Sequence, residues 1–123
     1  GINAEYGDIM SVKIETITQG DGKSIPQKGQ EVTVHYVGTL ISGKKFDSSR
    51  DRNEPFVFSL EVQQGLGKRD VVLGFHLVVA QMSVGQKVKA TIPFRYAYGV
   101  QGNPPKIPPK SDLIFEIELL SFK

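Results

Sequence analysis

At 123 residues the chain has the length of one compact domain, and its 39% of hydrophobic residues can build a core. The formal net charge is only +2, because 15 Lys and Arg are interleaved with 13 Asp and Glu, so no basic stripe indicates a nucleic-acid surface. The chain has no cysteine, which excludes disulfides, thiolate catalysis and thiolate metal sites and is compatible with a reducing compartment.

Neither a secretory signal nor a membrane span is recognisable in the sequence. Residues 1–10 mix polar and acidic residues, and the longest purely apolar runs are far too short to cross a bilayer. We therefore expect a soluble, cytoplasmic protein. The first nine residues show no periodicity, so residues 1–11 are predicted to be an N-terminal extension and residues 12–123 a single domain.

Six segments are predicted to be β-strands, most of them from an alternation of apolar and polar residues with period two. They are residues 12–18, 31–38, 45–48, 56–60, 87–92 and 113–119. In the second segment Val32, Val34 and Tyr36 share one face, which predicts that this face is buried. The last two segments place these residues on their inner faces: Val88, Ala90, Ile92, Leu113, Phe115, Ile117 and Leu119.

The period changes to that of a helix between residues 70 and 85. Four apolar residues at spacings of three, four and three form one stripe: Val72, Phe75, Val79 and Met82. Asp70 suits the N-cap, and Gly85 follows the last apolar turn. Gly74 costs about 1 kcal/mol relative to alanine, which allows the helix to begin as late as this residue. An antiparallel sheet that wraps one short helix is an α+β domain.

The long segment 94–110 holds four prolines and two glycines, and long ordered loops in compact domains are commonly functional.

Conventional catalytic motifs are missing. The only histidines, His35 and His76, lack metal-ligand spacing, so we expect no metal or cofactor and two solvated or hydrogen-bonded surface histidines. Residues 65–68 depart from a phosphate-binding loop and are predicted to be a turn, and no nucleophile elbow is present.

Five segments together resemble the FKBP-type peptidyl-prolyl cis-trans isomerases, in particular the small, single-domain, cytosolic immunophilins that bind macrolides. They are VHYVG at 34–38, GKKFDSSRDR at 43–52, VAQMSVGQ at 79–86, YAYG at 96–99 and LIFEIELL at 113–120. The resemblance implies a five-stranded antiparallel half-barrel sheet wrapped around one short α-helix. It also implies rotamase activity on Xaa-Pro bonds, a role in protein folding, and binding of tacrolimus and rapamycin in the same pocket.

Carried over position by position, the resemblance implies a catalytic set of Tyr36, Phe46, Asp47, Phe75, Tyr98 and Phe115. It implies that substrate or macrolide is also bound by Arg52, Phe56, Val71, Val72 and Ile107. Phe75 would form the floor of the pocket, Arg52 would pair with Asp47, and the Tyr98 hydroxyl would hold the peptide. Without the resemblance, the aromatic residues would by default be ordinary core residues, and Asp47 a turn or capping group.

The chain departs from the family pattern at a few positions. Phe75 stands where the family prototype has tryptophan, residues 61–66 resemble an insertion, and Asn103 and Lys106 change the proline-rich loop. Two other function classes remain open: a module that binds proline peptides or a partner without turnover, and a β-rich nucleic-acid binder, which the charge pattern disfavours. The expected partners are proline-containing peptides and proteins and macrolides, with no nucleic acid or membrane, and the expected state is a monomer.

Overall fold

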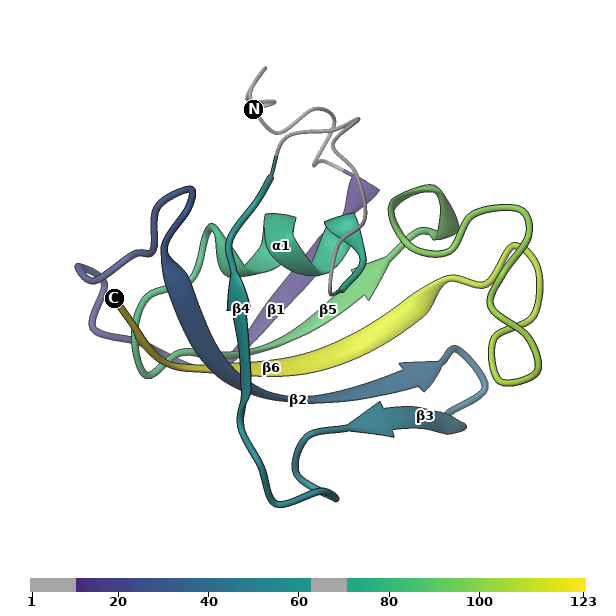
Figure 1. Ribbon diagram of the computed structural model, residues 1–123, viewed down its shortest axis with the longest axis horizontal. Helices are drawn as coiled ribbons and strands as arrows, with labels where there is room; N and C mark the ends of the chain where they lie inside the picture. The colour runs from purple at the N-terminus through teal and green to yellow at the C-terminus, as the bar shows by residue number, and fades with distance from the viewer. Residues whose placement is uncertain (1–10, 63–70) are drawn as a thin grey trace.

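The computed structural model describes residues 11–62 and 71–123, which form one antiparallel sheet curled around a helix (Figure 1). Its strands are β1 (Lys13–Thr18), β2 (Glu31–Leu40), β3 (Lys45–Ser48), β4 (Phe56–Ser59), β5 (Lys87–Ile92) and β6 (Leu113–Phe122), and the helix is α1 (Leu73–Val79). The α+β prediction is therefore confirmed. No helix in the described ranges is long and apolar enough to cross a bilayer.

The strands run in the order β1, β5, β6, β2, with β3 and β4 both paired to the remaining side of β2. β3 pairs with residues 37–39 of β2, and β4 pairs with residues 31–34. The described chain thus has six strands instead of the five expected for the family, because residues 49–55 interrupt one edge and divide it in two. The arrangement of the sheet is otherwise as predicted.

The core lies between the concave face of the sheet and α1. The inner residues predicted for the last two strands are all buried: Val88, Ala90, Ile92, Leu113, Phe115, Ile117 and Leu119. Val32, Val34 and Tyr36 on β2 are buried as well, which confirms the prediction that this face of the strand is buried. β1 differs, since all six of its residues are exposed; it borders only β5 and forms an edge of the sheet.

α1 is shorter than the apolar stripe suggested. It begins at Leu73 with Val72 at the N-cap and ends at Val79, whereas the predicted cap, Asp70, lies outside the described residues. Gly85 does not cap the helix: with φ +90° it belongs to the later turn into β5. Met82 is buried although it lies beyond the helix. The chain after α1 continues in tight turns with i→i+3 hydrogen bonds, such as that from Met82 N–H to Val79 C=O.

His76 corrects one expectation, because this residue is buried and not at the surface. It is 2% exposed, and its Nδ1 accepts a hydrogen bond from the Glu61 backbone N–H at 3.0 Å. The helix is buried almost all round, so a polar residue on it needs a local partner. His35 is hydrogen-bonded as expected, with Nδ1 2.8 Å from Ser49 Oγ.

The segment 94–110 is ordered by short-range hydrogen bonds. It begins with a 3₁₀ turn, Phe94–Tyr96, and Asn103 and Ile107 exchange backbone hydrogen bonds of 2.8 and 3.2 Å. The Pro104-Pro105 bond is cis. Three predictions cannot be compared with the described residues, because the turn at 65–68, most of the insertion at 61–66 and nearly all of the extension at 1–11 lie outside them.

Replacing Gly74 by alanine is expected to destabilise the fold, although alanine is the better helix former by about 1 kcal/mol. A Cβ at this position would overlap Cγ2 of Ile92 and lie 3.1 Å from the carbonyl oxygen of Tyr96. We expect the free energy of unfolding to fall by about 1–3 kcal/mol, the usual cost of overpacking, as measured by urea denaturation. An unchanged or higher denaturation midpoint would show that helix propensity outweighs this contact.

Candidate functional site

Five of the aromatic residues named from the sequence contact one another, although they come from five different elements. The ring centroid of Phe75 on α1 lies 5.4 Å from that of Tyr36 on β2 and 5.2 Å from that of Phe115 on β6. Phe46 on β3 lies 5.6 Å from Phe115. Phe56 on β4 lies 5.6 Å from Tyr36. We call these five residues the ring cluster; all four of these contacts are edge-to-face, the favourable geometry for aromatic pairs.

Gly38 on β2 makes room for two of these rings. A Cβ at this position would lie 2.6 Å from Cζ of Phe46 and 2.9 Å from Cε1 of Phe115. The missing side chain therefore lets β3 and β6 bring their aromatic residues together over the β2 backbone. The same alternation that buries Tyr36 directs position 38 toward the helix side of the sheet.

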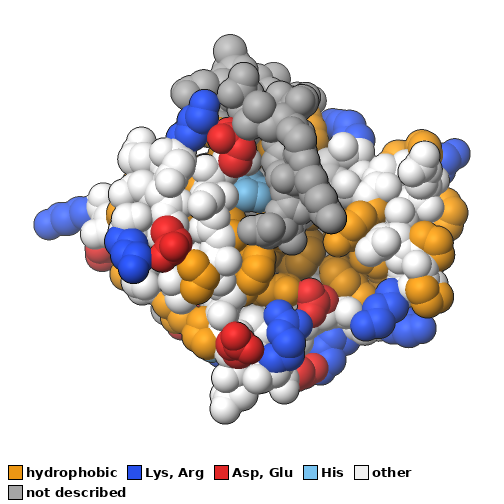
Figure 2. All heavy atoms as spheres, viewed as in Figure 1, with side chains coloured by type: hydrophobic (Ala, Val, Ile, Leu, Met, Phe, Trp, Pro, Cys, Tyr) orange, Lys and Arg blue, Asp and Glu red, His pale blue; other side chains and the backbone are white. Residues whose placement is uncertain are grey.

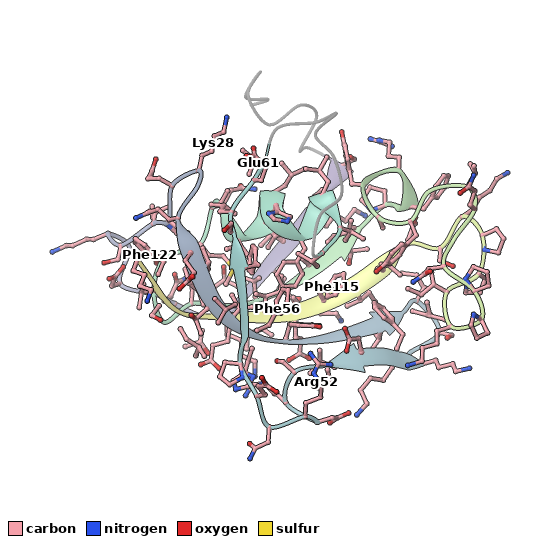
Figure 3. All side chains as sticks on the ribbon, viewed as in Figure 1. Lys28, Arg52, Phe56, Glu61, Phe115 and Phe122 are labelled. Atoms are coloured by element: carbon pink, nitrogen blue, oxygen red, sulfur yellow. The ribbon has the colours of Figure 1, made fainter. Side chains whose placement is uncertain are left out.

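The ring cluster is closed at its base and open at its rim. Phe75 is 0% exposed, Phe115 3% and Tyr36 6%, whereas Phe46 and Phe56 are half-buried. On the face drawn in Figure 2, hydrophobic side chains lie in a hollow bordered by charged ones. Figure 3 shows Phe56 and Phe115 near each other below α1, with Arg52 beyond them next to β3. The accessible rings of the cluster are therefore those of Phe46 and Phe56, while Phe75 lies at its base.

Asp47 is held at the edge of the ring cluster by two neighbours. Its Oδ2 accepts a hydrogen bond of 2.5 Å from the Tyr36 hydroxyl, and its Oδ1 accepts one of 2.5 Å from the Arg52 guanidinium. Arg52 also donates to the Tyr36 hydroxyl at 3.2 Å, which closes a three-residue network. The side chains of Asp47 and Arg52 are 40% and 47% exposed, so the ion pair orients these groups more than it stabilises the fold.

The network holds each member in one protonation state. Burial raises the pKa of Asp47, but the hydrogen bond from Tyr36 and the hydrogen bond and charge of Arg52 outweigh it, so the net pKa is lowered. Burial, followed by the hydrogen bond to Asp47, raises the pKa of Tyr36. The hydrogen bonds to Tyr36 and Asp47 raise the pKa of Arg52. At neutral pH the site therefore presents an ionised carboxylate that two hydrogen bonds hold in place.

Tyr98 approaches the site from the long loop. Burial, and then the negative charge of Asp47, raises the pKa of the Tyr98 hydroxyl, which therefore stays protonated at neutral pH. The ring is 37% exposed. Tyr98 also lines a cavity of about 370 Å³ together with Val71 and Val72, which brings three further predicted residues together. The Val72 carbonyl already accepts the backbone N–H of Phe75 at 3.0 Å, which starts the helix.

Ile107 lies in the same hydrophobic core as Tyr36, Phe75 and Phe115. It is 2% exposed. Its neighbour Lys106 reaches the backbone carbonyl of Phe46 with Nζ at 3.5 Å, which ties the loop to β3 beside the cluster. The residues that the structure describes contain no group of His, Asp and Glu side chains placed to hold a metal ion.

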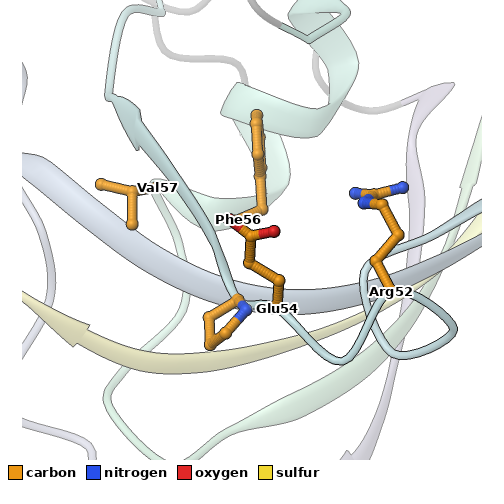
Figure 4. Close-up of a pocket in the computed structure, with 5 residues that line it drawn as sticks. Arg52, Glu54, Phe56 and Val57 are labelled. Atoms are coloured by element: carbon orange, nitrogen blue, oxygen red, sulfur yellow. The ribbon is translucent and has the colours of Figure 1, made fainter.

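A second cavity adjoins the site and was not foreseen from the sequence. Its volume is about 340 Å³, and it is lined by Arg52, Glu54, Pro55, Phe56 and Val57 (Figure 4). Arg52 and Phe56 also belong to the network and the ring cluster, so the two regions are continuous. Three of the lining residues were not singled out, because in the sequence they look like an ordinary turn and the exposed side of a strand.

Replacing Tyr36 by phenylalanine is expected to raise the pKa of Asp47, because the largest of the effects that lower it is lost. In the wild type the carboxyl should titrate below its ordinary value of 3.8 in a ¹³C NMR titration. A lowered pKa contributes stability that is present above the unfolded-state value and is lost as the pH falls through the folded-state value. Tyr96→Phe serves as the control and should leave the titration curve of Asp47 unchanged. A pKa of Asp47 at or above 3.8 in the wild type would contradict the network.

Comparison with known proteins agrees with this fold. The family model for FKBP-type peptidyl-prolyl cis-trans isomerases matches residues 22–120. The chain is 53% identical over 111 residues to "Peptidyl-prolyl cis-trans isomerase FKBP1A" of Xenopus laevis, covering 90% of this chain and 97% of that protein. FkpA from Escherichia coli superposes with a TM-score of 0.78 at 38% identity over 91% of this chain, which spans 48% of the FkpA chain. The chain therefore belongs to the family of FKBP-type peptidyl-prolyl cis-trans isomerases.

Proposed function

We propose that this chain accelerates cis-trans rotation of Xaa-Pro peptide bonds at the rim of the ring cluster, between Asp47 and Tyr98. The observation that carries this proposal is the convergence of five rings from five elements beside one oriented carboxylate. Membership of the isomerase family and the isomerase name of the frog relative support the same activity. No other reaction class is suggested by the described side chains.

Rotation about a peptide bond needs no bond cleavage. Amide resonance opposes the rotation by about 18–20 kcal/mol, and the spontaneous exchange of an Xaa-Pro bond takes tens to hundreds of seconds. A catalyst has only to bind the twisted amide better than either planar form, and each 1.36 kcal/mol of this preference gives about a tenfold acceleration. The planar amide carries more charge separation than the twisted one, so apolar ring walls disfavour the planar state more.

The residues of the site divide this work between walls and polar contacts. The half-buried rings of Phe46 and Phe56 receive the proline ring, while Phe75 and Phe115 hold these walls from beneath. Tyr98 donates a hydrogen bond to a carbonyl that flanks the proline and thereby orients the chain. The Asp47 carboxylate borders the twisting bond and acts through its charge, because its lowered pKa keeps it ionised.

Further properties belong to the same proposal. The rim that receives a proline ring would also receive the macrolides tacrolimus and rapamycin. Residues 12–123 act as one domain, the protein works as a monomer in the cytoplasm, and its clients are proline-containing proteins whose folding it assists. Val71, Val72 and Ile107 complete the binding surface, with Val71 and Val72 beside Tyr98 in one cavity.

An exchange assay on a short Xaa-Pro peptide tests the activity directly. We expect the wild-type chain to accelerate cis-trans exchange, measured by NMR or in a protease-coupled assay, and we expect rapamycin to inhibit it at the same site. Chemical-shift changes at Phe46 and Tyr98 should accompany binding of both ligands. Peptide binding without faster exchange would favour a binding module and would refute the catalytic proposal.

Substitutions separate the roles of the hydroxyl and the walls. Tyr98→Phe should raise KM by about three- to tenfold through loss of one hydrogen bond. Phe75→Leu and Phe115→Leu should lower kcat/KM by about tenfold, because the rings at the rim lose the aromatic side chain that supports them. Leucine is chosen because it is apolar and close enough in size to preserve the fold. Phe122→Leu, half-buried on β6 outside the ring cluster, is the matched control. Equal kcat/KM for the wild type and the three site variants would eliminate this mechanism.

A further inference from the structure

β4 leaves one edge of the sheet open beside the site. Glu31 exchanges both backbone hydrogen bonds with Lys123, at 3.0 and 2.9 Å, so its N–H and C=O point toward β6 and away from β4. Glu31 and Ser59 are therefore a non-hydrogen-bonded pair, and so are Thr33 and Val57 two residues further along the ladder. The backbone N–H and C=O of Val57 and Ser59 consequently point outward, where no described residue bonds to them.

The cavity lined by Arg52 and residues 54–57 lies at the start of β4, where this open edge begins. Phe56 and Val57 are consecutive strand residues whose side chains point to opposite faces, so a cavity lined by both must lie at the edge of the strand. Its volume of about 340 Å³ falls at the lower end of the range for ligand sites, about 300–1,000 Å³. Arg52 and Phe56 line this cavity and also belong to the network and the ring cluster, so one extended chain can reach both places.

The charge of this cavity is unbalanced. Arg52 is already hydrogen-bonded to Asp47 and Tyr36, so its positive charge is largely compensated. Figure 4 shows the Glu54 carboxylate directly below Phe56, with the Arg52 guanidinium to the right of both in this view. Within the described chain no group forms a hydrogen bond or an ion pair with that carboxylate. Asp47 does not line the cavity, but it already pairs with Arg52, so the charge of Glu54 is the one that remains and that a cationic side chain would neutralise.

We infer that the cavity beside β4 is a second subsite, which binds a Lys or Arg side chain of the proline-containing substrate against Glu54. The substrate backbone lies extended along β4 and bonds to the outward N–H and C=O of Val57, as in the addition of a peptide strand to a sheet edge. The main chain supplies affinity that is independent of sequence, and Glu54 supplies the preference for a basic residue. This inference rests on the proposed isomerase function and identifies its substrate class.

A set of extended Xaa-Pro peptides tests the inference. One Lys or one Glu is moved through the second and third positions before and after the proline in an otherwise uncharged peptide, and kcat/KM is measured for each. At one position we expect the Lys peptide to be preferred over the Glu peptide by about fivefold at low salt. This preference should fall toward one as the ionic strength rises. Methylation of the backbone nitrogen of the preferred Lys residue should raise KM, because it removes the N–H group that would donate a hydrogen bond to the β4 backbone.

Variants assign the preference to a residue. Glu54→Gln should reduce the Lys-to-Glu ratio to about one, and Glu54→Lys should invert it. Glu15→Gln removes the same charge from β1 at the opposite edge of the sheet and should leave the ratio at its wild-type value. A ratio near one in the wild type, or a ratio that survives Glu54→Gln, would overturn the inference. Turnover of the uncharged peptide by the wild type reports separately on the proposed isomerase function.

Discussion

The packing of Phe75 against the rings around it is the contact on which both the fold and the site depend. This side chain joins α1 to β2 and β6, and it has no exposed surface. The sheet curls around the helix because several strands bury aromatic rings against this one residue. The same packing fixes the rings that reach the rim, so the fold and the shape of the site are determined together.

A polar network of Asp47, Tyr36 and Arg52 lies at the edge of the ring cluster. Asp47 stays ionised beside apolar walls because Tyr36 and Arg52 donate hydrogen bonds to it. Since both side chains of the ion pair are nearly half exposed, the pair orients the carboxylate and the hydroxyl and has little effect on stability. Arg52 then also bounds the cavity along β4, so one guanidinium links the proposed catalytic rim to the proposed subsite.

Much of the fold and of the candidate site was predictable from the sequence. Alternating residues gave the inner faces of β2, β5 and β6, because the period of a strand is independent of its neighbours. The motif resemblance named the members of the ring cluster and the pair Asp47 and Arg52, which the structure brings together. The burial of His76 was not predictable from the sequence, because local periodicity does not show which segment of the chain will cover the outer face of a helix.

The sequence by itself determined the strand segments, the presence of a helix and the residue types that the site contains, since these depend on local periodicity and family motifs. Only the tertiary structure decided that α1 ends at Val79, that one edge is split into β3 and β4, and that Glu54 shares a cavity with Arg52. These features depend on long-range packing and strand pairing. Such contacts join residues that are distant in the chain, or residues whose side-chain direction cannot be predicted from a local sequence pattern.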